Sequence, residues 1–352
     1  MTDAAIVAPQ VRDLADLALA MAGWLAERVP GARDIRVTNL SYPLGAGLSH
    51  ETILFDAEWT EGGSPRAQGM VVRIKPSQVT VYQDDMFDEQ YRLMQVMHDS
   101  GTVRIARPLW FEPDAALLSA PFFVMEKVAG RVAVSYPPYS KQGWLVDATP
   151  EQRATMWRDA VSQLAEIHRV PISSAPFLAM PGGATGFDQE IDRWRRYIDW
   201  VDPAGERRLL RDTFAELLAK GPANRPEGIV WGDARLGNMM IGPDFSVAAV
   251  MDWEQPSLGG ALQDLGWWLQ IDQNQTVAQG ITPLGGMGNR EQTIALWSEV
   301  SGKSAVDIEW YEAFACFKME CLAIRMIAIR EMPAAMKMAE PGSRTKAMLE
   351  AL

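Results

Sequence analysis

Apolar positions in the first third of the chain change from helical to strand spacing. Helical spacing connects the opening apolar residues Leu14, Leu17, Met21, Trp24 and Leu25, which predicts an amphipathic helix. The runs that follow are β-prone and are separated by turn residues. In chain order they predict three strands, a helix and two further strands, over residues 35–42, 52–59, 70–74, 86–98, 108–112 and 122–127.

Helical periodicity dominates the rest of the chain. The expected helices cover residues 151–169, 189–200, 207–220 and much of 292–338. A β-rich part over residues 1–127 and a mainly helical part over residues 128–352 predict two lobes in an α+β fold. A cleft between two such lobes is the default ligand site.

One hairpin interrupts the helical part. Two short apolar runs, 239–241 and 247–251, flank a Gly-Pro-Asp turn. Asn238 precedes the first strand and Asp252 follows the second, so folding brings both side chains to one end of the hairpin, and Asp233 lies nearby in the preceding loop. An amide oxygen and a carboxylate that converge suit a hard cation such as Mg²⁺, and a further carboxylate could hold a nucleophile. The hairpin therefore predicts half of a phosphoryl-transfer site.

Composition excludes some classes of partner. The formal net charge of −12 argues against nucleic acid, which needs a basic face. Cys316 and Cys321 point to different faces of one predicted helix, so neither a disulfide nor a metal pair is expected. The longest uncharged stretch, 171–187, is broken by Pro and Gly and could not span a bilayer. Charged residues near the N-terminus argue against a signal peptide, and we expect a cytoplasmic protein with no membrane partner.

The hairpin belongs to a longer motif. It reads Trp231-Gly232-Asp233-Ala234-Arg235-Leu236-Gly237-Asn238, then Asp252-Trp253-Glu254, and later Asp264-Leu265. This combination resembles the aminoglycoside phosphotransferase-like (APH/choline kinase-like) family of small-molecule kinases, in which Gly-Asp-x4-Asn precedes Asp-Trp-Glu and a later Asp-Leu. The resemblance covers most of the chain. It implies a bilobal protein-kinase-like fold, ATP or GTP as co-substrate, Mg²⁺ as cofactor and a small-molecule alcohol as acceptor.

The resemblance implies a role for each residue of the motif. Asp233 would be the catalytic base for the acceptor hydroxyl, and Asn238 and Asp252 would be metal ligands. Arg235 would lie against the γ-phosphate, and the alternative is a solvated loop arginine. For Asp233 and Asn238 the alternative is capping of turn backbone. The family usually has His where this chain has Trp231, and packing of the indole could replace the bracing by that His.

Other acidic and imidazole groups have less defined roles. Asp264 would accept hydrogen bonds from the catalytic-loop backbone, or it would be a helix N-cap. Glu254 is expected to be a loop carboxylate. No histidine has metal-ligand spacing to another, and His168 is expected to be a packed structural residue.

A phosphate-covering loop and a cation are expected in the first lobe. Gly45, Gly47 and Ser49 lie between two predicted strands, where backbone could approach phosphate closely, although an ordinary hairpin turn has the same composition. On the next strand, Arg73 aligns with the cation that holds the α- and β-phosphates. Lys75 points to the same face and is the alternative.

The sequence offers two candidates for the partner of that cation. Where the family tends to have Glu on the next helix, this chain has Gln90, so either Gln90 bonds Arg73 as a neutral partner or the register is shifted by one residue to Glu89. The last strand of the lobe resembles the hinge of such kinases. Adenine would bind to its backbone between Glu126 and Val128.

The acceptor is left open by the motifs. An aminoglycoside would require spare carboxylates in the helical lobe, whereas a hydroxyacyl thioester would require apolar walls and a basic patch. The Arg- and Trp-rich segment 191–200 argues against an aminoglycoside and favours a hydroxyacyl or other alcohol metabolite. A nucleotide-binding module without turnover is the alternative suggested by Trp231 and Gln90. A metal hydrolase would need more clustered His, Asp and Glu ligands.

Overall fold

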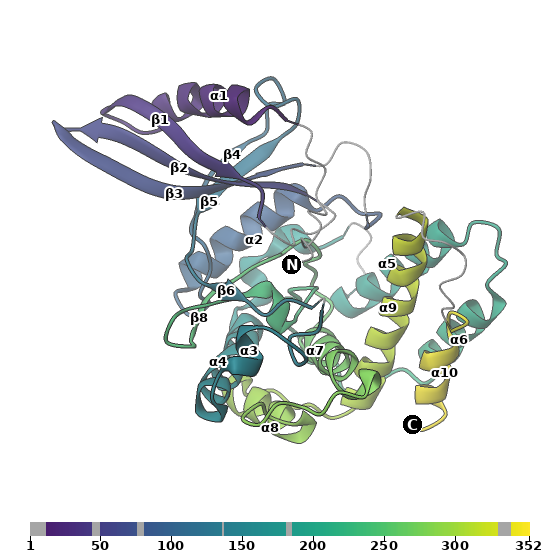
Figure 1. The fold of residues 1–352 in the computed structure, drawn as a ribbon. Coiled ribbons are helices and arrows are strands. Elements are labelled where there is room, and N and C mark those ends of the chain that lie inside the picture. The colour runs from purple at the N-terminus through teal and green to yellow at the C-terminus, as the bar shows by residue number, and fades with distance from the viewer. Residues whose placement is uncertain (1–11, 44–49, 76–80, 136, 181–184, 330–338) are drawn as a thin grey trace. The chain divides into compact units, whose positions relative to one another are not determined.

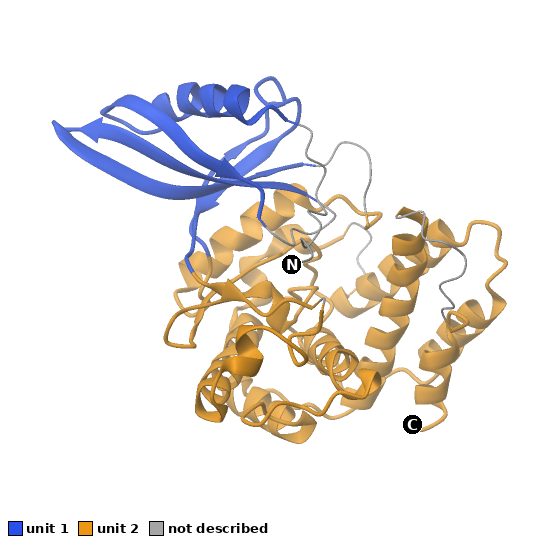
Figure 2. Cartoon of the chain, viewed as in Figure 1, with its two compact units in different colours: residues 1–80, 106–129 blue, residues 81–105, 130–352 orange. Residues whose placement is uncertain are grey.

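The computed structural model describes residues 12–43, 50–75, 81–135, 137–180, 185–329 and 339–352. Contacts divide the chain into two compact units (Figure 1, Figure 2). Unit 1 has residues 1–80 and 106–129, and unit 2 has residues 81–105 and 130–352. The division falls after Ala129, close to the expected lobe boundary after residue 127, but it groups helix α2 (Phe87–Ser100) with unit 2. The assignment of α2 to the first lobe stays a prediction.

Unit 1 is built on a five-stranded antiparallel sheet with the strand order β1-β2-β3-β5-β4. The strands are β1 (Ala32–Ser41), β2 (Glu51–Glu61), β3 (Ser64–Ile74), β4 (Pro108–Glu112) and β5 (Phe122–Glu126). Gly62 and Gly63 connect β2 to β3, and their φ angles of 56° and 80° are the positive values that a tight hairpin turn requires. The predicted order of three strands, a helix and two strands is confirmed.

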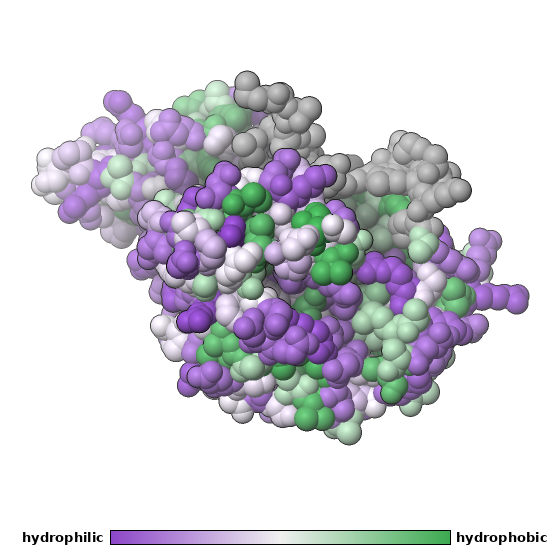
Figure 3. Space-filling view, turned by 60° about the horizontal axis from the view of Figure 1, so that its bottom comes forward, coloured by the Kyte–Doolittle hydropathy of each residue, from purple (hydrophilic) through white to green (hydrophobic). Residues whose placement is uncertain are grey.

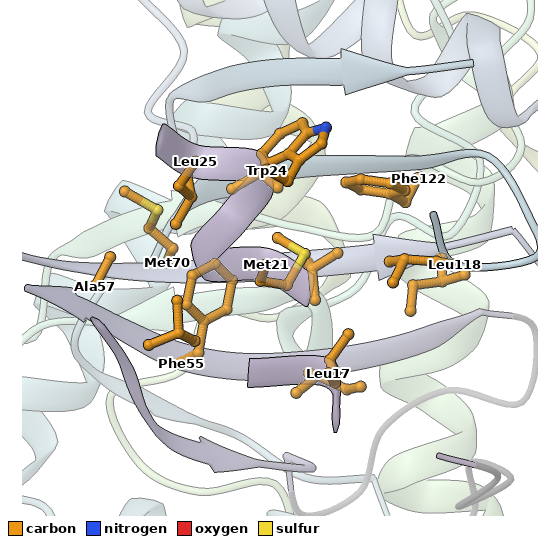
Figure 4. Close-up of a cluster of buried hydrophobic side chains, with 14 of the residues drawn as sticks. Leu17, Met21, Trp24, Leu25, Phe55, Ala57, Met70, Leu118 and Phe122 are labelled. Atoms are coloured by element: carbon orange, nitrogen blue, oxygen red, sulfur yellow. The ribbon is translucent and has the colours of Figure 1, made fainter. Parts of the chain in front are cut away.

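Helix α1 (Leu14–Ala26) packs on this sheet. Asp13 caps its N-terminus by accepting from the backbone N–H groups of Ala15 and Asp16. The apolar face of α1 packs against strand residues that include Phe55 and Phe122 (Figure 4). The buried residues of α1 are Leu17, Met21, Trp24 and Leu25. These four belong to the helical pattern in the sequence, so the predicted opening helix is confirmed.

Unit 2 is mainly helical. After α2 its helices are α3 (Trp144–Asp147), α4 (Pro150–Arg169), α5 (Gly186–Val201), α6 (Arg208–Ala219), α7 (Leu262–Gln275), α8 (Arg290–Ser301), α9 (Ile308–Ile329) and α10 (Ser343–Leu349). Short 3₁₀ helices are η1 (Ile172–Ser174), η2 (Pro176–Leu178), η3 (Leu236–Asn238) and η4 (Val277–Gln279). Helix α4 begins at a capping box, in which the side chains of Thr149 and Gln152 each accept from the backbone of the other. The segment expected to be helical within 292–338 contains most of α8 and all of α9, which are separated by residues 302–307; residues 330–338 lie outside the described ranges.

Helix α9 packs against α5, α6, α7 and α10. It approaches α7 closely at Gly266, where a Cβ atom would lie only 2.6 Å from the backbone carbonyl carbon of Tyr311. Cys316 and Cys321 of α9 are both buried. Within the described ranges, no helix has both the length and the apolar composition to cross a bilayer. On the face drawn in Figure 3, hydrophobic side chains form small groups among hydrophilic ones.

A small antiparallel sheet in unit 2 carries the motif. Its order is β6 (Arg131–Val132), β7 (Met239–Ile241) and β8 (Val247–Val250). Strands β7 and β8 form the predicted hairpin, which is confirmed. The sequence pattern does not predict β6, because two residues are too few to show a period. Its pairing of Arg131 with Ile241 covers the outer edge of β7.

Candidate active site

The hairpin brings its two ends together. Strand pairing joins Met239 to Val250, and the ladder continues one step further because Met251 N donates to Asn238 O at 2.8 Å. Asp252 follows directly with a φ of 63°, a value that is uncommon for a residue other than glycine. Such costly backbone conformations are concentrated at functional sites, which supports a functional role for this carboxylate.

Asp233 is held by three side-chain donors. Trp267 Nε1 donates to its Oδ1 at 2.9 Å. Arg235 Nε and Asn238 Nδ2 donate to its Oδ2 at 2.8 and 2.7 Å. Bonds to an ionised carboxylate are strong, so together they fix its orientation. The side chain is still 24% exposed and therefore accessible to a reactant.

The amide of Asn238 is oriented by the same residue. Its Nδ2 donates both to Oδ2 and to the backbone oxygen of Asp233, at 2.7 and 2.9 Å. Because both partners are acceptors, the amide nitrogen must face Asp233, which leaves Oδ1 of Asn238 for another ligand. This Oδ1 and the Asp252 carboxylate fit Mg²⁺, which usually takes few protein ligands and fills its shell with phosphate oxygens and water. Among the described residues, no group of three or more His, Cys, Asp and Glu side chains could hold a metal.

Negative charge accumulates around this site. Burial raises the pKa of Tyr82 well above its usual range, and so do three carboxylates around it, Asp233, Glu254 and Asp252. Burial acts to lower the pKa of Arg235, but the Asp233 and Asp252 carboxylates outweigh burial and raise it. Arg235 is therefore cationic at neutral pH, and the surplus of carboxylates favours a further cation.

The loop that carries Asp233, residues 231–238 and named the catalytic loop after its proposed role, contains a glycine that has no room for a side chain. Gly232 has a φ of 105°, and a Cβ atom there would lie 2.4 Å from the carbonyl oxygen of Gln255. The preceding Trp231 is fully buried; its Nε1 donates to Met251 O at 2.8 Å, and its ring centroid lies 5.8 Å from that of Trp253. Trp231 thus braces the loop by a hydrogen bond as well as by packing, although the sequence predicts packing alone.

Asp264 fixes the backbone of the same loop. Its Oδ2 accepts from Trp231 N at 2.6 Å and its Oδ1 accepts from Gly232 N at 2.9 Å. Helix α7 begins at Leu262, so Asp264 lies within the first turn, and the alternative of a helix N-cap is wrong. The N-cap is Ala261, whose methyl side chain has no acceptor for the first N–H groups of the helix. The Asp264 carboxylate bonds instead to the backbone N–H groups of Trp231 and Gly232.

His168 extends this network. Its Nε2 lies 3.1 Å from Asp264 Oδ2, and Trp297 Nε1 donates to its Nδ1 at 2.8 Å. Since an indole N–H can only donate, Nδ1 carries no proton and Nε2 is the donor to Asp264. The expectation of a packed, buried histidine is confirmed. His168 on α4 and Trp297 on α8 thus connect both helices, through Asp264, to the loop that carries Asp233.

The residues expected to bind nucleotide are divided between the units. In unit 1, Arg73 lies on β3 with Nη2 3.1 Å from His50 Nδ1. Lys75 follows that strand, and its N donates to Pro121 O at 3.0 Å. Arg73 and Lys75 both stay candidates for the phosphate-binding cation. The expected phosphate-covering loop, with Gly45, Gly47 and Ser49, lies outside the described residues.

The remaining nucleotide-site predictions concern the hinge and α2. Glu126 ends β5, and its N donates to Arg107 O at 2.9 Å; Val128 lies in the segment that follows. Gln90 of α2 is fully buried, and neither of its amide atoms is hydrogen-bonded to a residue that the structure describes. Its role as a neutral partner of Arg73 stays a prediction.

The sequence interpretation misses two residues that bond to the site, Trp267 and Ser135, and a third, Tyr82, that lies within the electrostatic influence of its carboxylates. The sequence could have indicated Trp267. It follows Asp264 by one helical turn and therefore lies on a neighbouring part of the same face of α7. No sequence pattern indicates Ser135, whose Oγ accepts a hydrogen bond from Arg235 Nη1 at 2.7 Å. No sequence pattern indicates Tyr82 either, because it lies in a segment without hydrophobic periodicity.

Comparison with known proteins identifies a family and several relatives that match most of the chain. The model of the phosphotransferase enzyme family matches residues 43–300. The chain is 22% identical over 294 residues to a probable acyl-CoA dehydrogenase of Arabidopsis thaliana, and 23% identical over 296 residues to acyl-CoA dehydrogenase family member 11 of Homo sapiens. These matches cover 78% and 79% of the chain but 34% and 37% of the relatives. The chain therefore spans about a third of their length.

Solved structures share the fold. A candidate aminoglycoside phosphotransferase from Ralstonia eutropha superposes with a TM-score of 0.68 at 23% identity, covering 94% of this chain and 95% of that one. A thermostable mutant of aminoglycoside phosphotransferase APH(4)-Ia, in a ternary complex with ADP and hygromycin B, gives a TM-score of 0.53 at 14% identity over 94% and 97% of the two chains. The predicted kinase-like α+β fold is thereby confirmed.

Proposed function

This chain belongs to the phosphotransferase enzyme family, and from that premise we propose that it transfers the γ-phosphate of ATP or GTP to a hydroxyl group of a small molecule. The observation that carries the proposal is the fixed orientation of Asp233. Three donors hold its carboxylate at the hairpin end, beside Asn238 and Asp252. Phosphoryl transfer depends mainly on such positioning and on charge neutralisation.

In the proposed reaction Asp233 is the base. The acceptor O–H gives its proton to the carboxylate while its oxygen forms a bond to the γ-phosphorus. The bond from the γ-phosphorus to the β–γ bridging oxygen breaks, and its electron pair leaves with the nucleoside diphosphate. Asn238 Oδ1 and Asp252 would hold Mg²⁺, which neutralises phosphate charge when bound. Arg235, cationic beside Asp233, stabilises the same charge.

For the nucleotide we propose the residues that the motif indicates in unit 1. Gly45, Gly47 and Ser49 would cover the phosphates, and Arg73 or Lys75 would hold them. The adenine or guanine base would bond to backbone between Glu126 and Val128. A solved relative of the same fold was crystallised with ADP, which supports a nucleotide co-substrate.

As acceptor we propose a hydroxyacyl thioester. The curated relatives are named as acyl-CoA dehydrogenases, and the shared third of their length could act on the same class of compound. Carboxylates beside α5 are also neutralised within unit 2. Asp84 binds Arg196 at 2.8 Å, and buried Glu190 lies 3.9 Å from Lys318. They are therefore not spare partners for a polycation.

An aminoglycoside is the second candidate acceptor, because a relative of the same fold was crystallised with hygromycin B.

The test is to incubate the protein with Mg²⁺, with ATP or GTP, and with a panel of candidate acceptors. The panel contains hydroxyacyl-CoA thioesters, hygromycin B and kanamycin, and the phosphorylated product is detected by mass spectrometry. Asp233→Asn should lower kcat roughly a thousandfold. Asp244→Asn, at the exposed turn of the same hairpin, is the matched control and should be unaffected.

The outcomes separate the candidates. Transfer to a hydroxyacyl thioester that Asp233→Asn abolishes supports the proposal. Transfer to an aminoglycoside alone overturns the proposed acceptor but leaves the kinase activity. If the protein binds nucleotide but neither transfers its phosphate nor hydrolyses it, the binding module without turnover is favoured. The buried amide of Gln90, which has no hydrogen-bond partner among the described residues, also suggests such a module.

A further inference from the structure

We infer that Trp267 is a positioning residue, which holds Asp233 so that the acceptor hydroxyl binds to Oδ1 beside the indole. The inference rests on the proposed function and adds a determinant of acceptor orientation to the same site. It concerns residues of unit 2 alone.

The two oxygens of Asp233 are not equivalent. Each carboxylate oxygen can accept about two hydrogen bonds. Oδ2 already accepts two, from Arg235 Nε at 2.8 Å and Asn238 Nδ2 at 2.7 Å. Within the described residues, Oδ1 accepts one side-chain bond, from Trp267 Nε1 at 2.9 Å. The open lone pair is therefore on Oδ1, and a hydroxyl that gives its proton to Asp233 must approach there.

The indole that directs this oxygen is itself immobilised. Trp267 is 6% exposed and follows Gly266, where α7 and α9 approach at backbone distance. From α9, Lys318 Nζ lies 5.5 Å from the Trp267 ring centroid. A desolvated cation at this distance is attracted to the aromatic ring.

Lys318 is held in turn by groups that do not touch the catalytic loop. It is 4% exposed, its Nζ donates to Gln263 Oε1 at 3.2 Å, and it lies 3.9 Å from Glu190 Oε1. The ring of Trp267 is therefore fixed from α9, while its N–H reaches Asp233. Proton transfer to Oδ1 then occurs in one defined direction, which is what alignment in phosphoryl transfer requires.

The test compares two adjacent tryptophans of α7. Trp267→Phe keeps an aromatic ring but removes the N–H donor. Trp268→Phe is the matched control, because Trp268 is also 6% exposed and makes no hydrogen bond to Asp233. Two rates are measured: phosphoryl transfer from ATP to a hydroxyacyl-CoA thioester, and the slow hydrolysis of ATP. Water is the acceptor in hydrolysis, so this rate can be measured whichever alcohol the protein phosphorylates. A Mg²⁺–ATP thermal shift verifies folding and nucleotide binding.

Trp267→Phe should lower both kcat values roughly ten- to a hundredfold, the effect of losing one hydrogen bond to a charged group. The KM for ATP and the thermal shift should not change, and Trp268→Phe should resemble the wild type. Trp267→His, which offers an N–H in a smaller ring, should recover part of the kcat.

Three results would overturn the inference. One is equal kcat for the Phe variants of Trp267 and Trp268. Another is a joint loss of kcat and nucleotide binding in the Phe and His variants of Trp267, which would indicate a merely structural role. The last is a wild type that binds nucleotide but neither transfers nor hydrolyses it, and this result would remove the proposed function itself.

Discussion

Trp231 Nε1 donates a hydrogen bond to the carbonyl oxygen of Met251 at 2.8 Å. The donor stands at the start of the catalytic loop, and the acceptor immediately precedes the proposed metal ligand Asp252. Met251 N in turn donates to Asn238 O at 2.8 Å. The loop that leads to the proposed base Asp233 and the two proposed metal ligands, Asn238 and Asp252, are thus connected through the two backbone groups of Met251.

The first prediction concerns this donor. Trp231→Phe removes the N–H and leaves the partly buried Met251 carbonyl without this donor, which should cost roughly 1 kcal/mol of unfolding free energy and lower kcat. Trp231→His can still donate, so it should retain more of the kcat although the smaller ring lowers stability through a cavity. Steady-state rates and urea unfolding of both variants provide the measurement. Full activity of the Phe variant beside a weaker His variant would mean that the indole acts by packing alone.

The second prediction concerns Mg²⁺ at Asp252. At a hundredfold excess over its dissociation constant, nucleotide should stabilise the wild type by roughly 2.7 kcal/mol when Mg²⁺ is present. Asp252→Asn should weaken this Mg²⁺-dependent shift, because one charged ligand is lost. Thermal-shift titrations with ATP and GTP, with and without Mg²⁺, measure it. Asp244→Asn is the control, and an unchanged shift in Asp252→Asn would refute the assignment.

The elements that the sequence predicts are those whose signal is local. The convergence of Asn238 and Asp252 follows from two short apolar runs and a turn sequence, so the hairpin alone determines it. The same holds for α1, whose buried face is the periodic face. Strand β6 could not be predicted, because its two residues are too few to show an alternation of apolar and polar positions.

The contacts that orient Asp233 depend on packing between distant segments. Trp267 is 34 positions away from Asp233, and Ser135 is 100 positions away from Arg235. No spacing rule connects such residues before the helices are placed. The sequence alone also cannot predict which bonds Asp264 makes. Its local preference for capping a helix is overridden by two hydrogen bonds to the loop backbone and one to His168.

The third prediction tests the network behind the loop. His168→Phe leaves Trp297 Nε1 buried without a partner and removes one donor from Asp264, so the free energy of unfolding should fall by roughly 1–3 kcal/mol, with a lower kcat. Trp297→Phe leaves the bond between His168 and Asp264 in place. It should therefore reduce stability with less effect on kcat. Equal kcat losses in the two variants would mean that His168 does not act through Asp264.

The fourth prediction concerns the buried pair of Lys318 and Glu190. Burial raises the pKa of Glu190, but Arg193 and Lys318 outweigh burial and lower it below its usual range. Burial lowers the pKa of Lys318. Glu190→Gln leaves a buried ammonium without its counter-charge and should cost roughly 3–5 kcal/mol at pH 7. Lys318→Met should cost less, because Glu190 keeps Arg193 at 3.7 Å.

Adding Lys318→Met to Glu190→Gln should restore much of the lost stability, because neither side chain then has to be desolvated as an ion. A coupling free energy near zero in this double-mutant cycle, measured by urea unfolding, would contradict the pairing. The pH dependence provides a second check. Since the folded pKa of Glu190 lies below its unfolded value of roughly 4.3, its ionised form contributes stability above that pH, and the contribution is lost as the pH falls through the folded pKa. Glu190→Gln should therefore make the acid limb of the stability profile shallower, whereas Glu299→Gln at an exposed position of α8 is the control for general charge effects.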